Sequence, residues 1–166
     1  GAHEFNPMQP SIALSETSMR LTGTEGDPAG ATGNISIRNA GGQVLSWHMS
    51  SQADWLHLDP SEGTSENDVD EIQLTIDTEN LTGGDYEAEL VVTDPSAVNN
   101  PQKIIIDLHV FGIIPVPQQY NTIQDAINVA QDGDTVLVAD GVYRGEGNRD
   151  IVFNGKAILL KSENGP

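Results

Sequence analysis

Residues Tyr120–Gly145, YNTIQDAINVAQDGDTVLVADGVYRG, carry the pattern that predicts the structure of the second half of this chain. Thr122 is a suitable N-cap, and the apolar residues at positions 123, 126, 127 and 130 recur at helical spacing. An Asp-Gly-Asp turn then leads into Thr135–Ala139, a nearly all-apolar strand of the kind that parallel sheets bury. The stretch therefore predicts a short amphipathic helix followed by a buried strand.

Strand-like segments continue towards the end of the sequence. Asp150–Phe153 and Ala157–Lys161 are both predicted strands. Together with the patterns T-I-Q-x-A-I, D-G-D-T-V and G-x-Y, this rhythm resembles the start of a right-handed parallel β-helix of the pectin lyase-like class. The resemblance implies a capping helix over the hydrophobic end and a first coil. Because such solenoids need about three stacked repeats, we expect residues 113–166 to be a truncated β-helix domain.

Residues 7–112 differ in character and predict an all-β domain. We interpret residues 1–6 as a cloning scar or linker, and Ile113–Pro117 as a short, stiff proline-bearing bridge. Apolar and polar residues alternate in several runs, so Trp47 and its same-face neighbours should face a core between two packed sheets. The expected strands are Ser11–Ser15, Ser18–Thr22, Gly33–Arg38, Val44–Ser50, Trp55–Leu58, Glu71–Asp77, Asp85–Thr93 and Lys103–Phe111.

Two motifs in this domain carry a second resemblance. The spacing W-x(7)-W-L-x-L-x-P-x-x-G begins at Trp47, and G-x-Y-x-A-x-L begins at Gly84. Together they resemble the BACON-like branch of immunoglobulin-like β-sandwiches. The resemblance implies a module beside a catalytic or surface-anchored domain, and the family name implies carbohydrate binding. The expected fold class is thus mainly β, with an immunoglobulin-like sandwich followed by the beginning of a parallel β-helix.

Composition limits the classes of partner. The 25 acidic residues outnumber the 7 basic ones and give a formal net charge of −18. This charge repels nucleic acid and anionic membrane surfaces, so we expect neither as a partner. The chain has no cysteine, which excludes disulfides and thiolate chemistry. We expect a secreted or cell-surface protein whose signal peptide has been removed.

Aromatic residues are the candidates for carbohydrate contact, because an aromatic face complements the C–H face of a sugar ring. Trp47 shares its strand face with apolar residues and is expected in the core. Trp55 is expected to be partly buried, and Tyr120, among polar neighbours, is the aromatic residue that we expect to be exposed. The predicted carbohydrate-binding residues are therefore Trp55 and Tyr120.

Clustered carboxylates raise the possibility of calcium. Asp68 and Asp70 lie in one short acidic loop, and Asp132 and Asp134 flank a glycine. Neither stretch carries the full set of spaced ligands of a calcium loop. Calcium at these four residues is a minor hypothesis beside a purely structural role, and no other cofactor is expected.

Three hypotheses for function remain open at this point. The first is a non-catalytic accessory module, for glycan adhesion or positioning, joined to a solenoid cap. The second is the N-terminal fragment of a polysaccharide lyase or glycoside hydrolase whose catalytic coils are absent, and the third is a structural spacer. No catalytic residue is predicted in this chain under any of them. The uncovered end of the last coil also predicts a homodimer through that end.

Overall fold

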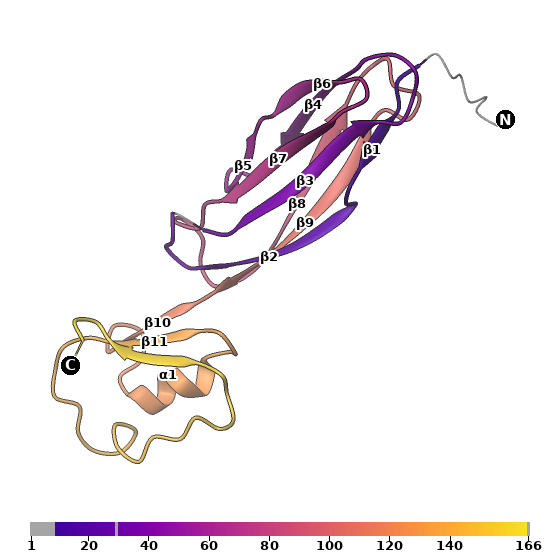
Figure 1. Ribbon diagram of the computed structural model, residues 1–166. Helices are drawn as coiled ribbons and strands as arrows, with labels where there is room; N and C mark the ends of the chain where they lie inside the picture. Colours follow the sequence, from indigo (N-terminus) through magenta and orange to yellow (C-terminus); the bar gives the residue numbers. More distant parts are fainter. Residues whose placement is uncertain (1–8, 29, 166) are drawn as a thin grey trace. The chain divides into compact units, whose positions relative to one another are not determined.

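The computed structural model describes residues 9–28 and 30–165, so residues 1–6, interpreted as a scar or linker, lie outside it. The chain forms two compact units. The first comprises the residues up to Gly23, Asp27–Thr78 and Asp85–His109, and the second comprises Thr24–Gly26, Glu79–Gly84 and Val110–Pro166. Figure 1 shows the strands of the first unit in two layers and a smaller sheet with a helix in the second.

The two layers of the first unit are antiparallel sheets. The four-stranded sheet has the order β1 (Ile12–Leu14), β3 (Thr32–Asn39), β7 (Val69–Ile76), β5 (Leu56–Asp59). The five-stranded sheet has the order β2 (Ser18–Thr24), β9 (Gln102–Phe111), β8 (Gly84–Thr93), β4 (Leu45–Ser51), β6 (Glu62–Ser65). The chain is therefore mainly β with a sandwich-like pair of sheets, as expected.

The core of the sandwich consists of the alternating apolar residues of both sheets. Trp47, Leu74 and Ile106 are examples of stripe residues that are at most 2% exposed. Because successive strand residues point to opposite faces, the polar residues between them face solvent. The predicted assignment of Trp47 to the core is confirmed.

One strand of the sandwich, β6, was not predicted from the sequence. β6 has the sequence EGTS, which lacks apolar alternation. It pairs with β4, and Gly63 lies opposite Trp47. A Cβ atom at Gly63 would lie 2.6 Å from Cζ2 of the Trp47 indole, so only glycine fits beneath that ring. The strand depends on a long-range contact and not on a local pattern.

The second unit contains a three-stranded parallel sheet. Its order is β10 (Ile113–Val116), β11 (Thr135–Val138), β12 (Leu159–Ser162). The interpretation of Ile113–Pro117 as only a bridge is wrong, because its first four residues form β10. Pro115 has no N–H to donate, which is tolerated in β10 because it is an edge strand.

The predicted helix is present as α1 (Ile123–Val129). Thr122 is its N-cap and accepts a hydrogen bond from the Asp125 amide, as the sequence predicts. Ala126, Ile127 and Ala130 are buried in a cluster with residues of β10 and β11. Figure 1 shows the helix lying against this sheet.

The predicted strand at Asp150–Phe153 is wrong, since this segment has no regular structure. The Gln124 side chain accepts a hydrogen bond from the Val152 amide and donates one to the Val152 carbonyl, each at 2.9 Å. The backbone polar groups that a neighbouring strand would satisfy are therefore bound by an amide side chain of the helix. Asp150 also has a φ of 54°, which is incompatible with an extended strand.

Candidate functional site

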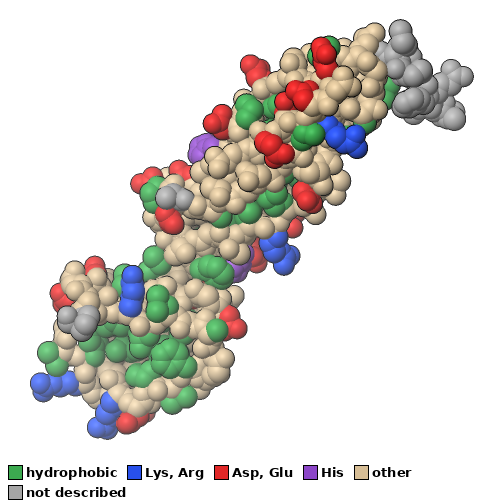
Figure 2. All heavy atoms as spheres, in the orientation of Figure 1, with side chains coloured by type: hydrophobic (Ala, Val, Ile, Leu, Met, Phe, Trp, Pro, Cys, Tyr) green, Lys and Arg blue, Asp and Glu red, His purple; other side chains and the backbone are tan. Residues whose placement is uncertain are grey.

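The outer face of the five-stranded sheet carries the most promising surface of the first unit. In β8, Ala88, Leu90 and Val92 are buried, whereas Asp85, Glu87 and Glu89 are exposed. The same alternation in β9 turns Asp107 and His109 outward, where they are half-buried. Charged side chains of two neighbouring strands thus meet on one face, and acidic side chains are visible over the first unit in Figure 2.

A shallow hollow of about 350 Å³ lies on this face beside Trp55. The Trp55 ring is half-buried and makes an edge-on contact with Tyr86, with 6.5 Å between ring centroids and 67° between ring planes. This contact fixes the orientation of the indole. The hollow is lined by Ser50, Ser51, Gln52, Ala53, Trp55, Glu87, Ala88, Glu89 and Val91. It therefore combines one aromatic ring with several hydrogen-bonding side chains.

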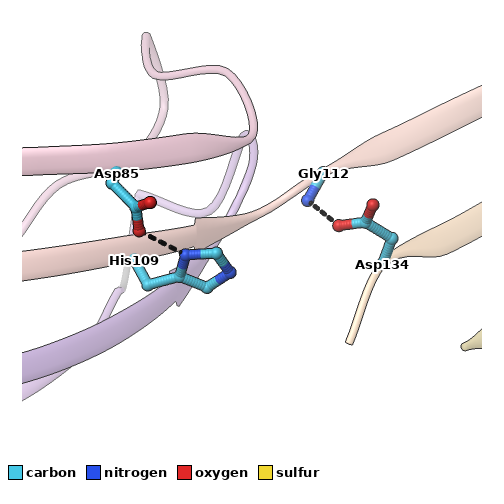
Figure 3. Close-up of polar contacts among 4 residues, drawn as sticks. All are labelled: Asp85, His109, Gly112 and Asp134. Carbon is cyan, nitrogen blue, oxygen red and sulfur yellow. Dashed lines mark hydrogen bonds and ion pairs between the residues drawn. The ribbon is translucent and has the colours of Figure 1, made fainter. Parts of the chain in front are cut away.

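A second hollow of about 450 Å³ lies across β8 and shares Glu87 with the first. It is lined by Arg20, Asp85, Tyr86, Glu87, Asp107, Leu108 and His109. The Nδ1 atom of His109 lies 2.6 Å from a carboxylate oxygen of Asp85, and Figure 3 shows the two side chains pointing toward each other. We call the two hollows together the Glu87 groove.

The predicted carbohydrate-binding residues lie in different units. Trp55 is partly buried as expected and lines the groove. Tyr120 belongs to the second unit, where it is half-buried and packs against the apolar cluster around α1. The expectation that Tyr120 would be exposed is wrong, because this packing covers part of its ring. Sugar binding at either residue stays a prediction.

The four carboxylates proposed for calcium make hydrogen bonds within the chain. A carboxylate oxygen of Asp70 accepts from the Trp47 indole N–H at 2.6 Å, and one of Asp132 accepts from the Ala157 amide at 2.9 Å. Asp134 accepts from the Gly112 and Gln131 amides with its two oxygens, the first of which appears in Figure 3. Within residues 9–28 and 30–165, no group of three or more His, Asp or Glu side chains is placed to hold a metal ion.

Asp68 carries the only resolved pKa shift in the described part of the chain. The amide of Glu66, its own amide and the Ser65 hydroxyl stabilise its ionised form and hold the pKa of this exposed carboxyl below the ordinary value of 3.8. The same carboxylate accepts a hydrogen bond from the Glu66 amide at 3.0 Å. This geometry gives Asp68 a role in its own turn, and calcium at the four carboxylates stays a prediction.

None of the helices in the described residues is both long and apolar enough to cross a membrane. No curated protein is significantly similar in sequence to this chain.

Solved structures similar to this chain share its fold at low identity. The ASH/PapD-like domain 7 of human CEP192 matches with a TM-score of 0.53 and 12% identity, over 68% of this chain and 92% of that domain. A family 123 glycoside hydrolase from Clostridium perfringens matches with a TM-score of 0.50 and 11% identity. That match covers 69% of this chain but 29% of the hydrolase, so the likeness concerns one part of the enzyme. These similarities agree with a β-sandwich.

The family comparison is more specific than the structural ones. The profile of the viral BACON domain matches residues 11–104, which is more than half of the chain and includes Trp47, Trp55 and Tyr86. The match covers both sheets of the sandwich as far as the first residues of β9. This chain therefore belongs to the family of viral BACON domains.

Proposed function

We propose that this chain is a non-catalytic accessory module that binds glycan through the Glu87 groove and acts outside the cell or on an exposed surface. The observation that supports the proposal is the half-buried Trp55 ring, which lines a hollow together with Ser50, Gln52 and Glu89. An aromatic face beside hydrogen-bonding side chains is suited to a sugar, which has an apolar C–H face and a polar rim. The family name agrees with this function.

Binding in such a hollow is weak. The groove is open, and a single ring contact is worth about 0.5–1.5 kcal/mol beyond its buried area. A short oligosaccharide would therefore bind with a Kd of about 0.1–1 mM. Weak binding is sufficient for an accessory module, because attachment to a larger protein or a repeated surface raises the effective concentration.

Affinity electrophoresis in gels that contain a soluble neutral polysaccharide tests the proposal. We expect the chain to be retarded, and we expect Trp55→Ala to abolish the retardation. Gln52→Ala, which removes a polar lining residue without touching the ring pair, should weaken it. Phe153→Ala, which removes an exposed aromatic ring of the second unit, serves as the control and should leave the retardation unchanged. Retention of full retardation by Trp55→Ala, with near-ultraviolet circular dichroism confirming the fold, would contradict the proposal.

We further propose that residues 113–166 are the cap and first coil of a pectin lyase-like β-helix, which the sandwich serves as an accessory module. Two features support this. β10, β11 and β12 pair in parallel, with Ile113 aligned to Thr135 and Thr135 aligned to Leu159. The helix α1 packs on the apolar cluster that contains Ile114, Val116 and Val136. Parallel strands stacked in register are the repeating element of a solenoid.

The absence of cysteine allows a clean test of this second proposal. Leu159 of β12 is 54% exposed, and a thiol at Leu159→Cys would be the single thiol in the chain. We expect a maleimide to label it rapidly, and we expect labelling to slow when a consensus β-helix coil is fused after Gly165. Val44→Cys, 44% exposed in the sandwich, is the matched control whose labelling should not change. Equal labelling at Leu159→Cys with and without the added coil would contradict the proposal.

A further inference from the structure

The Glu87 groove has an excess of carboxylates that the chain itself does not neutralise. Four acidic residues line it, namely Asp85, Glu87, Glu89 and Asp107. Asp85 is paired with His109 at 2.6 Å, and Glu89 is paired with Lys103 at 2.9 Å. The side chains of Glu87 and Asp107 have no ion pair or hydrogen bond to any other described residue.

The cations around the groove do not balance these carboxylates. Lys103 lies beside Glu89 and the imidazole of His109 lies beside Asp85, so among the described lining residues Arg20 is the cation left to offset Glu87 and Asp107. Exposed carboxylates on neighbouring strands repel anions at short range, and the effect weakens with salt. An anionic sugar placed against Trp55 would lie beside Glu87, which lines both hollows.

We propose that the Glu87 groove selects neutral or amino-bearing glycans over glycans that carry carboxylates or sulfates. Glu87 and Asp107 are the specificity-determining residues. This inference rests on the proposed glycan-binding function and adds the chemical class of the ligand. A sugar amine would be attracted by the two unneutralised carboxylates, whereas neutral sugars would use their hydroxyl groups as donors to the same oxygens.

The expected ratio of the affinities for neutral and anionic glycans follows from the charges of the two carboxylates. Two like charges about 7 Å apart in water repel enough to weaken binding about threefold, so two carboxylates give about tenfold. We therefore expect polygalacturonate fragments to bind about tenfold more weakly than neutral xyloglucan fragments of the same length at 50 mM salt. Glucosamine oligomers at pH 6 should bind more tightly than either. All three affinities should converge at 500 mM salt.

The experiment is calorimetric titration of the whole chain with these three probes, in EDTA so that no divalent cation bridges carboxylates. Glu87→Gln/Asp107→Asn should reduce the difference between the polygalacturonate and xyloglucan affinities to less than about threefold. The matched control is Glu16→Gln/Glu71→Gln, which removes two exposed charges away from the groove and should leave the difference unchanged. An equal reduction in both variants would mean that the net charge of the chain is responsible, and would overturn the assignment to Glu87 and Asp107.

Two further outcomes separate this inference from the proposed function. If polygalacturonate binds as tightly as xyloglucan and Trp55→Ala abolishes both, charge selection is overturned while glycan binding stands. If no probe binds and Trp55→Ala changes nothing, the proposed function and this inference fail together.

Discussion

The C-terminal end of α1 depends on a single lysine, and Lys156→Met should loosen it. The Nζ atom of Lys156 donates to the carbonyl oxygens of Ile127, Asn128 and Ala130 at 2.8, 2.6 and 2.8 Å. These carbonyls lie at the end of the helix, where intrahelical partners are lacking. A seven-residue helix is too short to be stable alone, so tertiary contacts of this kind hold it in place.

The magnitude follows from the three bonds. Each contributes about 0.5–1.5 kcal/mol net, and the cation at the negative end of the helix dipole adds about 0.3–1 kcal/mol. Methionine keeps the length of the apolar stem and removes every donor, so the local free energy of opening should fall by about 2–5 kcal/mol. Amide exchange of α1 should accelerate by about 30- to 5,000-fold.

Hydrogen exchange followed by mass spectrometry measures this change within the second unit. Both tryptophans, Trp47 and Trp55, lie in the first unit, so tryptophan fluorescence would not detect it. Lys161→Met is the matched control, because Lys161 is exposed and its amine has no partner among the described residues. Equal acceleration of α1 exchange in the two variants, or no acceleration in Lys156→Met, would show that these three hydrogen bonds do not hold the helix in place.

Four further predictions follow from particular contacts. Gly63→Ala should lower the stability of the sandwich by about 1–3 kcal/mol, measured by tryptophan fluorescence in urea, because the new Cβ would overlap the Trp47 ring. Asp68→Asn should make the stability of the fold depend less on pH at acidic pH. The pKa of the Asp68 carboxyl is lower in the folded chain than its ordinary value of 3.8, so the carboxylate stabilises the fold above pH 3.8, and this stabilisation is lost as the pH falls through the pKa of the folded state. Calcium at 1 mM should leave the thermal midpoint unchanged, because Asp70, Asp132 and Asp134 already accept hydrogen bonds, and a rise that Asp132→Asn abolishes would instead support a calcium site. If the edge strand β12 pairs with a second copy, sedimentation equilibrium should show a dimer that Leu159→Asp dissociates, whereas a strict monomer at high concentration would contradict that pairing.

The sequence predicted those parts of the fold whose signal is local. Alternation places Trp47 and its neighbours in the core because the strand period is two residues, and Thr122 begins α1 because its hydroxyl accepts from an amide three residues later. β6 could not be found in this way, since EGTS has no apolar pattern and is a strand only through its pairing with β4. β10 was missed for a related reason, because Pro115 is a strand residue only in the context of an edge.

For the candidate site, too, local sequence patterns were predictable and long-range contacts were not. The alternation of Asp85, Glu87 and Glu89 with buried residues is visible in the sequence and could have identified one charged strand face. The sequence could not place Trp55 beside Glu87, because the two meet through the fold of strands that are distant along the chain. Nor could it separate Trp55 from Tyr120, since the packing of Tyr120 against the α1 cluster depends on tertiary contacts.

The distribution of charge suggests how the two units could serve different tasks. The first unit contains 16 acidic and 3 basic side chains, a net charge of −13, whereas the second contains 9 acidic and 4 basic ones, a net charge of −5. Repulsion of anionic polymers therefore acts mainly where the Glu87 groove lies. The second unit, by contrast, carries a smaller net charge and has exposed apolar side chains such as Val152, Phe153 and Leu159, and Figure 2 shows hydrophobic side chains gathered on this unit. A small net charge and exposed apolar side chains favour close packing of further strands on the second unit. A large negative charge around a shallow polar groove favours selection among soluble ligands by the first unit.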